Sequence, residues 1–581
     1  MSKQKKSGNT AKAVQEVKTA AGEKNSIGLQ SVAGPESDRI NQRFSRITST
    51  LMTIYVLFYL CVFPLATHDK YFDILDFRFK LYWIPTLIYG LVFLVLGMFY
   101  LFSDKRRNGG TLTAKLKENI KWSVLKTKLT KTDICFIALI FIMTLSVLFA
   151  DYQYEALWGS RGRFNGLVLW LLFFIAYGLV TRFYHFRKWH LYAYLIAACL
   201  PEIWGMTDFF LVDIFGFHKD AAPAYIYTFA SSVGNINTYT NMVALHLGAS
   251  VALSVFAKDK REIIISGIAV LTSSFAIVMG NSDSGLLAFA AVFAFLPFAG
   301  WTSRRNISRY FVVLSVFVTA VIITAHMTVG RPTMIDNDGG SILIKIGKTK
   351  AILGFMMLLW GLTAVLYLRF RMKKDEQEKQ TVRYARKIWV LLFVVGIVAV
   401  LAVLIDANTG NHPEIWEPYK SALIFDDAWG NGRGMIWRFA WEFFTQKSTI
   451  LDKLIGNGPD TFFIITMDYF KKAMKAGGII FDSVHNEYLE CLVTIGILGT
   501  IAYIATLVTS LKQMLGNAKN AYAIACGIAV LAYAVQAIVN IAIPITMPIL
   551  MMLLYVGINI SSAATDCKTE MVKTEKESYE I

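Results

Sequence analysis

Residues 482–490 read Asp482-Ser483-Val484-His485-Asn486-Glu487-Tyr488-Leu489-Glu490, and they join a long polar segment to an apolar run over 491–508. A polar loop that closes onto a membrane helix places its last side chains at the boundary between water and lipid. We expect Asp482 or Ser483 to cap that helix and His485 to lie in its first turn. The positive end of the helix dipole disfavours an imidazolium and favours an anion, so the stretch predicts a neutral histidine suited to general-base chemistry. The alternative is that His485 is only a polar residue at a membrane interface.

The helix that follows is expected to be continuous and closely packed. From His485, helical spacing places Leu489, Leu492, Gly496 and Gly499 on one face. Small residues on that face allow a neighbouring helix to approach closely.

The composition indicates a polytopic membrane protein. The 581 residues are 55% hydrophobic and 14% aromatic, the mean hydropathy is +0.48, and the apolar residues come in blocks of roughly 20, the length that crosses a bilayer. The net charge of +17 does not indicate nucleic acid as a partner, because the cations lie between the apolar blocks, where the positive-inside rule explains them. Residues 1–46 are polar and lysine-rich without a cleavable signal, so we expect a disordered cytoplasmic tail.

The alternation of apolar and basic segments predicts an all-α transmembrane bundle of about 14 spans with both termini in the cytoplasm. The expected transmembrane domain covers residues 47–563, followed by a cytoplasmic tail at 564–581. The expected spans are 48–67, 81–102, 133–150, 165–184, 191–207, 238–257, 263–280, 285–301, 309–328, 350–370, 388–405, 487–509, 521–541 and 545–561. Alternation puts the basic connections 181–190, 258–262, 302–309 and 369–387 inside, and the connections 151–164, 208–237, 281–284, 330–349 and 406–484 outside.

The connection 406–484 is much longer than two spans need, which is typical of a functional loop. Residues 433–444 predict an amphipathic helix on the membrane surface, with a stripe formed by Ile436, Trp437, Ala440, Trp441 and Phe444. A glycine-rich turn follows at 456–460, and Pro459 is expected to open a short helix that runs to Tyr469.

Cysteine and histidine spacing predicts neither a disulfide framework nor a metal site. The chain has six cysteines and eight histidines, with no paired spacing of cysteines and no two histidines at i, i+4 near a carboxylate. We therefore expect no cofactor and no metal.

Three groups of polar residues in the outward connections are candidates for ligand binding. Arg161 and Arg163 lie in a glycine-rich segment at 158–166, and Arg433 lies between two glycines; guanidiniums can hold phosphate oxygens in a bidentate fork. Alternatively, these arginines contact lipid headgroups or pair with Asp426, Asp427 or Glu442. Asn235 and Asn237 precede a span and offer amides to sugar hydroxyls, although helix capping explains them equally well.

Together these motifs resemble the O-antigen ligase and O-antigen polymerase family of bacterial membrane glycosyltransferases, over residues 150–560. The resemblance rests on Arg433 four residues before Trp437, on the glycine-rich turn 456–462, and on His485-Asn486 with Leu489, followed by Gly496-Ile497-Leu498-Gly499. Arg163 with Gly166, and Gly234-Asn235-Ile236-Asn237, are similar to two further stretches of the family. One position departs from it, because Asp283 stands where many members carry an arginine; an acid there repels pyrophosphate.

The resemblance implies a metal-independent, inverting transfer of a glycan from an undecaprenyl-pyrophosphate donor to an acceptor hydroxyl. This would take place at the outer face of the cytoplasmic membrane during assembly of a surface polysaccharide, with a saccharide or lipid acceptor. The implied roles are His485 and Arg433 in catalysis, Arg163 and Arg161 on the pyrophosphate, and Trp437, Asn486, Asn235 and Asn237 on the acceptor or sugars. The residues do not decide whether the protein is a polymerase or a ligase. A rival hypothesis is a transporter or flippase of lipid-linked saccharides, although most predicted spans lack the central charges that such proteins carry.

Overall fold

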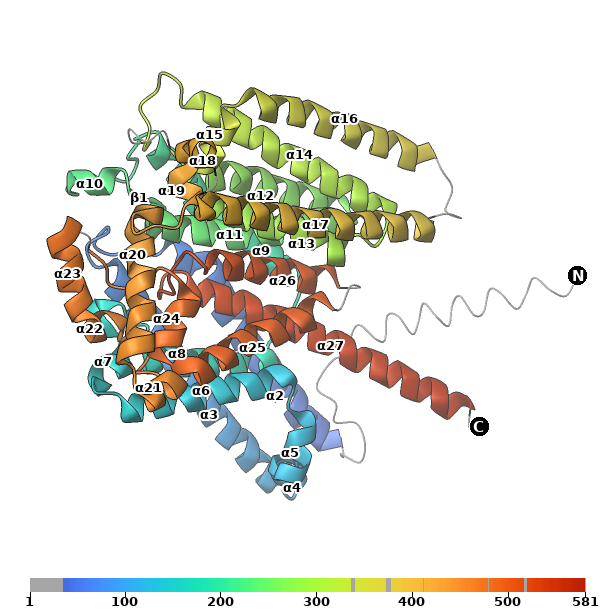
Figure 1. The fold of residues 1–581 in the computed structure, drawn as a ribbon. Coiled ribbons are helices and arrows are strands. Elements are labelled where there is room, and N and C mark those ends of the chain that lie inside the picture. The colour runs from blue at the N-terminus through green and yellow to red at the C-terminus, as the bar shows by residue number, and fades with distance from the viewer. Residues whose placement is uncertain are drawn as a thin grey trace, which may run out of the picture. The chain divides into compact units, whose positions relative to one another are not determined.

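A computed structural model describes residues 35–335, 340–372, 378–410, 412–478, 480–516 and 520–579. The described chain is almost entirely helical (Figure 1), which confirms the all-α prediction. Two short strands, β1 (Phe229–Ala230) and β2 (Gly234–Asn235), form one antiparallel pair in which Phe229 faces Asn235. Residues 1–34 of the expected tail lie outside the described residues, and helix α2 begins at Pro35.

The chain divides into two compact units, one formed by residues 1–52 and 89–128 and the other by 53–88 and 129–581. In the smaller unit, Asp104 accepts hydrogen bonds from the backbone N–H groups of Leu112 and Thr113, at 3.3 and 2.7 Å, and so satisfies the first turn of α4. Its helices or parts of helices are α2 (Pro35–Leu57), α3 (Ile74–Arg107), α4 (Thr111–Ile120) and α5 (Trp122–Lys128).

The larger unit holds the remaining helices and, as described below, the candidate site. Up to residue 347 its helices are α6 (Lys131–Phe149), α7 (Gln153–Trp158), α8 (Leu167–Phe183), α9 (Lys188–Phe209), α10 (Pro223–Ile226), α11 (Ile236–Phe256), α12 (Lys260–Met279), α13 (Ser284–Gly300), α14 (Arg304–Met327) and α15 (Ile342–Gly347). After it come α16 (Lys350–Met372), α17 (Glu378–Thr409), α18 (Pro413–Trp416), α19 (Lys420–Leu423), α20 (Trp429–Glu442), α21 (Ile450–Ile455), α22 (Phe462–Ile465), α23 (Met467–Gly477), α24 (Glu487–Thr494), α25 (Gly496–Leu515), α26 (Ala521–Gln536) and α27 (Met547–Tyr579).

Nine helices among the described residues are long and apolar enough to cross a membrane, and the number is ten if the bent pair formed by residues 153–162 and 167–183 counts as one span. The protein is therefore a multi-pass membrane protein. The other expected spans coincide with α9, which carries Glu202 and Asp208, and with the shorter apolar helices α13, α26 and the first part of α27. The total of 14 stays a prediction.

The connections that alternation assigns to the outside meet at one end of the helices of the larger unit. Asn237 accepts a hydrogen bond from Ser282 Oγ at 2.7 Å, the N–H of Ile342 donates to Asp283 Oδ1 at 2.7 Å, and the N–H of Met334 donates to the carbonyl of Phe209 at 2.9 Å. We call this the polar end. The same end carries α10, β1, α20 and α23 (Figure 1).

The basic connections meet elsewhere in the same unit. The guanidinium of Arg305 donates to the carbonyl of Ala257 at 3.0 Å, and that of Arg386 donates to the carbonyl of Trp301 at 2.9 Å. Connections 258–262, 302–309 and 369–387 are thereby joined, as an alternating arrangement of spans requires.

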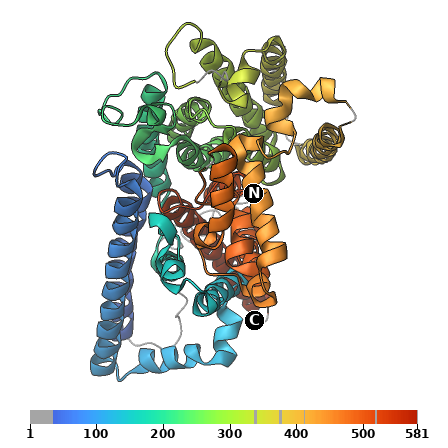
Figure 2. The same ribbon diagram turned by 60° about the vertical axis from the view of Figure 1, so that its left-hand side comes forward.

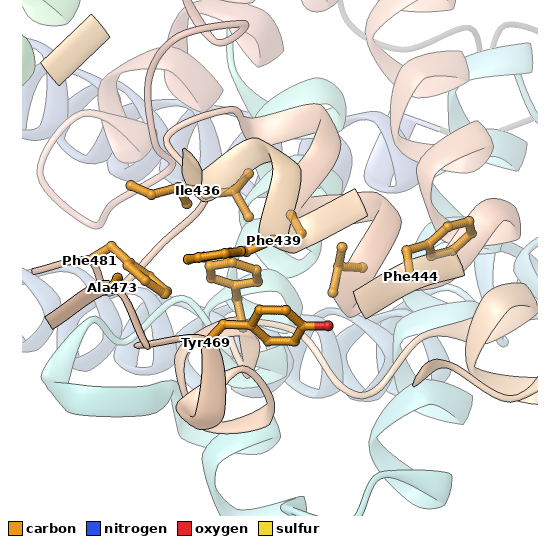
Figure 3. Packing of buried hydrophobic residues seen from close by; sticks show 10 residues of the cluster. Ile436, Phe439, Phe444, Tyr469, Ala473 and Phe481 are labelled. Atoms are coloured by element: carbon orange, nitrogen blue, oxygen red, sulfur yellow. The ribbon is translucent and has the colours of Figure 1, made fainter. Parts of the chain in front are cut away.

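The long connection folds beside α24 (Figures 1 and 2), and the two share an apolar core. Figure 3 shows Ile436, Phe439 and Phe444 of this loop packed with Tyr469 and Phe481. Val484 and Val493 belong to the same cluster. Because Val484 directly precedes His485, this core fixes the backbone that carries the histidine.

The amphipathic stripe is buried only in part. Ile436, Ala440 and Phe444 face the loop core, whereas Trp441 is 55% exposed. The assigned range of α20 begins at Trp429, but Gly430, Asn431 and Gly432 have left-handed backbone angles, so the right-handed helix begins at Arg433 as expected. It continues into a π-helical turn over Phe443–Lys447. The helix thus packs mainly on the protein itself.

The glycine-rich turn reverses the chain and docks on the next membrane helix. The prediction that Pro459 opens a helix is wrong, because Asp460 has a φ of 59° and α22 begins only at Phe462. Gly456, with a φ of 82°, lies against the backbone where α24 ends: a Cβ there would stand 2.2 Å from the carbonyl oxygen of Thr494. Only glycine permits this approach.

The expected continuous helix after His485 is also interrupted. Helix α24 ends at Thr494 and α25 begins at Gly496, whose φ is 68°. A Cβ on Gly496 would lie 2.5 Å from the carbonyl of Leu454. The glycine turn and the glycines that follow α24 are therefore two sides of one contact, and Gly496 does not continue the face that begins at Leu489.

Candidate functional site

His485 lies in the last residues of the loop, just before α24 begins. Asn486 is the N-cap: its side-chain oxygen accepts hydrogen bonds from the N–H groups of Tyr488 and Leu489, both at 3.1 Å. The expected cap at Asp482 or Ser483 is therefore wrong, and His485 stands outside the first helical turn. Its φ of 55° is uncommon for a residue with a side chain.

The surroundings of His485 keep its imidazole neutral. Its pKa is lowered to about 4, first by burial and then by the positive charge of Arg433, with a smaller contribution from Arg163. Asp482 acts in the opposite direction. At pH 7 the ring is therefore uncharged, as the sequence predicted, but burial and two guanidiniums are the causes, in place of a helix dipole.

Trp437 holds the segment that carries the histidine. Its indole N–H donates to the carbonyl of Val484 at 3.1 Å, and its ring lies 5.0 Å from that of Trp429. Both rings line an open groove whose other residues are Phe425, Asp426, Asp427, Gly434 and Arg438. Flat aromatic faces beside carboxylates are surfaces on which sugar rings can stack.

Arg433 is a partly buried cation of the site with few protein partners. Three preceding residues with positive φ, Gly430, Asn431 and Gly432, turn the chain into α20. One guanidinium nitrogen of Arg433, Nη1, donates to the carbonyl of Gly430 at 3.1 Å, and its buried Nε has no hydrogen-bond partner. Burial lowers the pKa of Arg433, and the negative charge of Asp283 opposes this effect.

The acids that might have neutralised Arg433 are used by a neighbouring arginine. Arg438 pairs with Asp427 at 2.7 Å and with Glu442 at 2.9 Å. Within the described residues no carboxylate lies within 4.0 Å of the Arg433 guanidinium. A buried guanidinium without a close counter-charge is a good anion site.

Arg163 is already paired. Its side chain is almost fully buried, with Nε 3.1 Å from Asp460 Oδ1 and Nη1 3.2 Å from Asp482 Oδ1. Burial alone would lower the pKa of Arg163, but Asp460, Glu490 and Asp482 outweigh burial and raise it. Arg163 therefore ties together three segments, around residues 163, 460 and 482, while its charge still acts on His485.

The other arginine of that segment lies apart from these acids. Arg161 is exposed, has a φ of 49°, and places its guanidinium 4.3 Å from the centre of the Phe463 ring. This is cation–π geometry. The structure therefore gives the two neighbouring arginines different surroundings.

Asn235, Asn237 and Asp283 belong to a hydrogen-bonded rim at the polar end. Asn235 caps α11 by accepting from the N–H of Asn237 at 2.8 Å, and Asn237 accepts from Ser282 as described above. The next residue, Asp283, is exposed and acts electrostatically on Arg433. Asp283, the residue that departs from the family pattern, thus lies close enough to Arg433 to affect its pKa.

The structure brings Arg433 and Arg163 within electrostatic range of His485. Trp437 contacts the residue before the histidine, and Asn486 is the residue after it. Sequence reasoning missed the acids that position them. Asp460 is 4% exposed and holds Arg163, while Glu490 accepts from the N–H of Val484 at 3.1 Å. The one signal for Asp460 was its place directly after the glycine turn.

Residues 339–504 match the family model described as O-Antigen ligase. The match supports an assignment of this part of the chain to the O-antigen ligase family. The matched range contains Arg433, Trp437 and His485 but not Arg163. The match supports a membrane function of the O-antigen ligase or polymerase type. A comparison with curated proteins finds no match to this chain.

Proposed function

We propose that this O-antigen ligase family member is a metal-independent, inverting glycosyltransferase that moves a glycan from undecaprenyl pyrophosphate to an acceptor hydroxyl. The reaction takes place on the outer face of the cytoplasmic membrane, and the acceptor is a saccharide or a lipid. The observation that carries this proposal is a neutral His485 within range of Arg433, a partly buried guanidinium that has no close carboxylate among the described residues.

His485 is proposed as the general base. An acceptor hydroxyl is a poor nucleophile, and a neutral imidazole nitrogen can take its proton as the oxygen attacks the anomeric carbon of the donor. The bond from that carbon to the pyrophosphate oxygen breaks, and its electron pair leaves with the pyrophosphate. A single displacement of this kind inverts the anomeric centre.

Arg433 is proposed to receive the departing pyrophosphate. Its Nε is buried without a partner, so a phosphate oxygen would supply the missing acceptor and a counter-charge in the same contact. The leaving group is thereby stabilised by a protein cation, and no step of this scheme requires a metal ion.

Arg163 is proposed to stabilise the same pyrophosphate from a greater distance. Two of its nitrogens are held by Asp460 and Asp482, so it contributes charge and a fixed position, with Nη2 as the donor left for a phosphate oxygen. Arg161, with no acid beside it in the described residues, is the outer candidate for the pyrophosphate.

The groove beside Trp437 is proposed to hold sugar rings of the donor or the acceptor. Trp429 and Trp437 offer stacking faces, and the acids of the groove offer hydrogen bonds to hydroxyls. Asn486, Asn235 and Asn237 are proposed to add contacts through their side-chain amide groups, since their oxygens already accept protein hydrogen bonds.

A direct test incubates the purified chain with a lipid-pyrophosphate oligosaccharide and follows free lipid pyrophosphate and new glycosidic product together. We expect both to appear in equal amounts. A donor that remains intact in the presence of every acceptor class offered, saccharide and lipid, would refute the transfer reaction.

The rival function, transport of a lipid-linked saccharide, is favoured by one observation. Glu202 and His246 form a fully buried pair, 2.7 Å apart, between helices α9 and α11. Charged or polar pairs inside spans are typical of transporters. The same incubation separates the two functions, because a transporter moves the donor across reconstituted vesicles and leaves it uncleaved.

A further inference from the structure

Three metal-ligating side chains meet at the polar end, in the connection between α9 and α11. Asp208 ends α9, and Asp213 and His218 follow at intervals of five residues. One ligand atom of each residue lies within 4.8 Å of the other two. A divalent ion of transition-metal size lies about 2.0–2.2 Å from each ligand, so these three side chains need only small adjustments to bind one ion together.

The tautomer of His218 leaves a lone pair facing a carboxylate. Its Nε2 lies 2.9 Å from the carbonyl oxygen of Phe229. A carbonyl only accepts hydrogen bonds, so Nε2 carries the proton and donates it. In the neutral ring, Nδ1 then carries a lone pair that faces Asp213 Oδ1, 3.6 Å away. The lone pair and the negative carboxylate oxygen repel each other, and a cation bound between them would relieve this repulsion. A separation of 3.6 Å suits two ligands of one metal ion.

Asp208 supplies a buried oxygen that has no hydrogen-bond partner. The residue is 1% exposed; its Oδ2 accepts from the N–H of Ser231 at 2.6 Å, while Oδ1 has no partner. The indole of Trp204 faces the same carboxylate, but its Nε1 also lacks a partner within hydrogen-bond geometry. A buried carboxylate oxygen that is left unsatisfied is costly unless a ligand completes it.

The protein itself provides little positive charge here. Within the described residues, no lysine or arginine lies within 4.0 Å of Asp208 or Asp213, and His218 is the basic group that pairs with them. The ligands are held in place: Asp213 accepts from the N–H groups of Phe217 and His218, at 2.8 and 2.9 Å. Such outer hydrogen bonds are typical of metal ligands.

We propose that Asp208, Asp213 and His218 form a binding site for one divalent transition-metal ion of the Zn²⁺ kind, with water completing its coordination. Two carboxylates and an imidazole suit Zn²⁺ better than Ca²⁺ or Mg²⁺, which prefer oxygen ligands alone. The histidine and cysteine spacings that we searched in the sequence did not include this Asp, Asp, His arrangement, so the sequence analysis did not find it.

The ion would brace the start of α11. His218 donates to Phe229 of β1, β1 pairs with β2, and β2 ends at Asn235, the cap of α11. Metal binding at His218 therefore fixes, through one strand pair, the segment that carries Asn235 and Asn237. This role concerns the fold of the connection and is independent of the proposed transfer reaction.

The test strips the purified full chain with a chelator and then titrates it with Zn²⁺ alone, with calorimetry and elemental analysis as readouts. We expect about one tightly bound Zn²⁺ per chain and a higher melting temperature in the bound state. His218→Gln and Asp213→Asn, at half-buried positions, should each weaken binding by about ten-fold or more and abolish the thermal shift.

Two control variants separate this site from other binding of Zn²⁺. His412→Gln removes an exposed histidine beside Asp406, and Glu202→Gln alters the second group of possible ligands, Cys199, Glu202 and His246. Both should bind Zn²⁺ as the wild type does. The proposal is overturned if the wild type binds no Zn²⁺, or if His218→Gln and Asp213→Asn bind it as tightly as the wild type.

Discussion

A histidine with a pKa of about 4 is a weak base in the empty site, but the cations that lower its pKa are the groups proposed to bind the donor. When a pyrophosphate occupies Arg433, its negative charge compensates the guanidinium, and the pKa of His485 rises toward its ordinary value. The base therefore gains proton affinity only when the donor is bound. This coupling protects the site from protonation between turnovers.

Replacing Arg433 should impair transfer far more than replacing Arg438 on the same helix. Arg433→Gln removes a cation whose N–H groups are not all used by protein acceptors, so we expect the rate of transfer to fall by about 10²–10³. Arg433→Lys should restore only part of that rate, because a lysine lacks the planar fork of a guanidinium. Arg438→Gln is the matched control, since that guanidinium is exposed and paired with Asp427 and Glu442. Equal rates in Arg433→Gln and Arg438→Gln would assign Arg433 a structural role.

The same pair of variants makes a prediction about pH. His485 loses its function as a base when pH falls through its pKa, so the acidic limb of kcat/KM in the wild type should lie near pH 4. Arg433→Gln removes the larger of the two positive influences, so the pKa of His485 rises and the limb moves to higher pH. Arg438→Gln should leave the limb in place. A limb that Arg433→Gln does not move would show that Arg433 does not act on the histidine.

At the scale of elements, the contact between Gly456 and the end of α24 sets the position of the histidine segment. We expect Gly456→Ala to lower the melting temperature well beyond Gly478→Ala. Both glycines have positive φ, at 82° and 68°, but a Cβ on Gly478 meets no atom within 4 Å, whereas on Gly456 it overlaps the Thr494 carbonyl. The difference therefore isolates the overlap, worth about 1–3 kcal/mol. Equal melting temperatures would mean that α24 moves away at little cost.

The sequence predicted the membrane helices well and the loop poorly, for physical reasons. A membrane span must satisfy its backbone hydrogen bonds within one helix of about 20 apolar residues. Such a run of apolar residues can be recognised directly in the sequence. The cap of α24 has no such signal, because Asp482, Ser483 and Asn486 are all good caps. The choice of Asn486 depends on distant contacts, such as that of Trp437 with Val484.

The charges of the site show the same limit. Arg433 and Arg438 lie in one helix, and composition alone does not decide which of them takes the nearby acids. In the structure Asp427 and Glu442 both pair with Arg438. Arg433 directly follows the left-handed turn at Gly430–Gly432 and does not pair with either acid. Similarly, His485 was expected to be neutral, but the buried arginines that keep it so come from segments about 320 and 50 residues away in the sequence.

At the scale of the whole molecule, the account requires the polar end to face outward. Asp468, whose side chain is 90% exposed, lies in the long connection, and Lys379 lies exposed in a basic connection. In a background without the six native cysteines, a thiol reagent that does not cross membranes should label Asp468→Cys in intact cells. It should label Lys379→Cys only after the membrane is opened. The reverse pattern would place the candidate site in the cytoplasm, where the proposed reaction does not take place.

If His485 removes the proton of the acceptor, its loss should slow transfer without weakening donor binding. Purified wild type, His485→Ala and His412→Ala are each mixed with one equivalent of lipid-pyrophosphate oligosaccharide and excess acceptor, and product formation and donor binding are measured in the same sample. His412 is exposed and hydrogen-bonded to Asp406, so it serves as the control. We predict that His485→Ala binds the donor normally but transfers about 10²–10⁴ times more slowly, whereas His412→Ala behaves as the wild type. Transfer at the wild-type rate by His485→Ala would contradict the account.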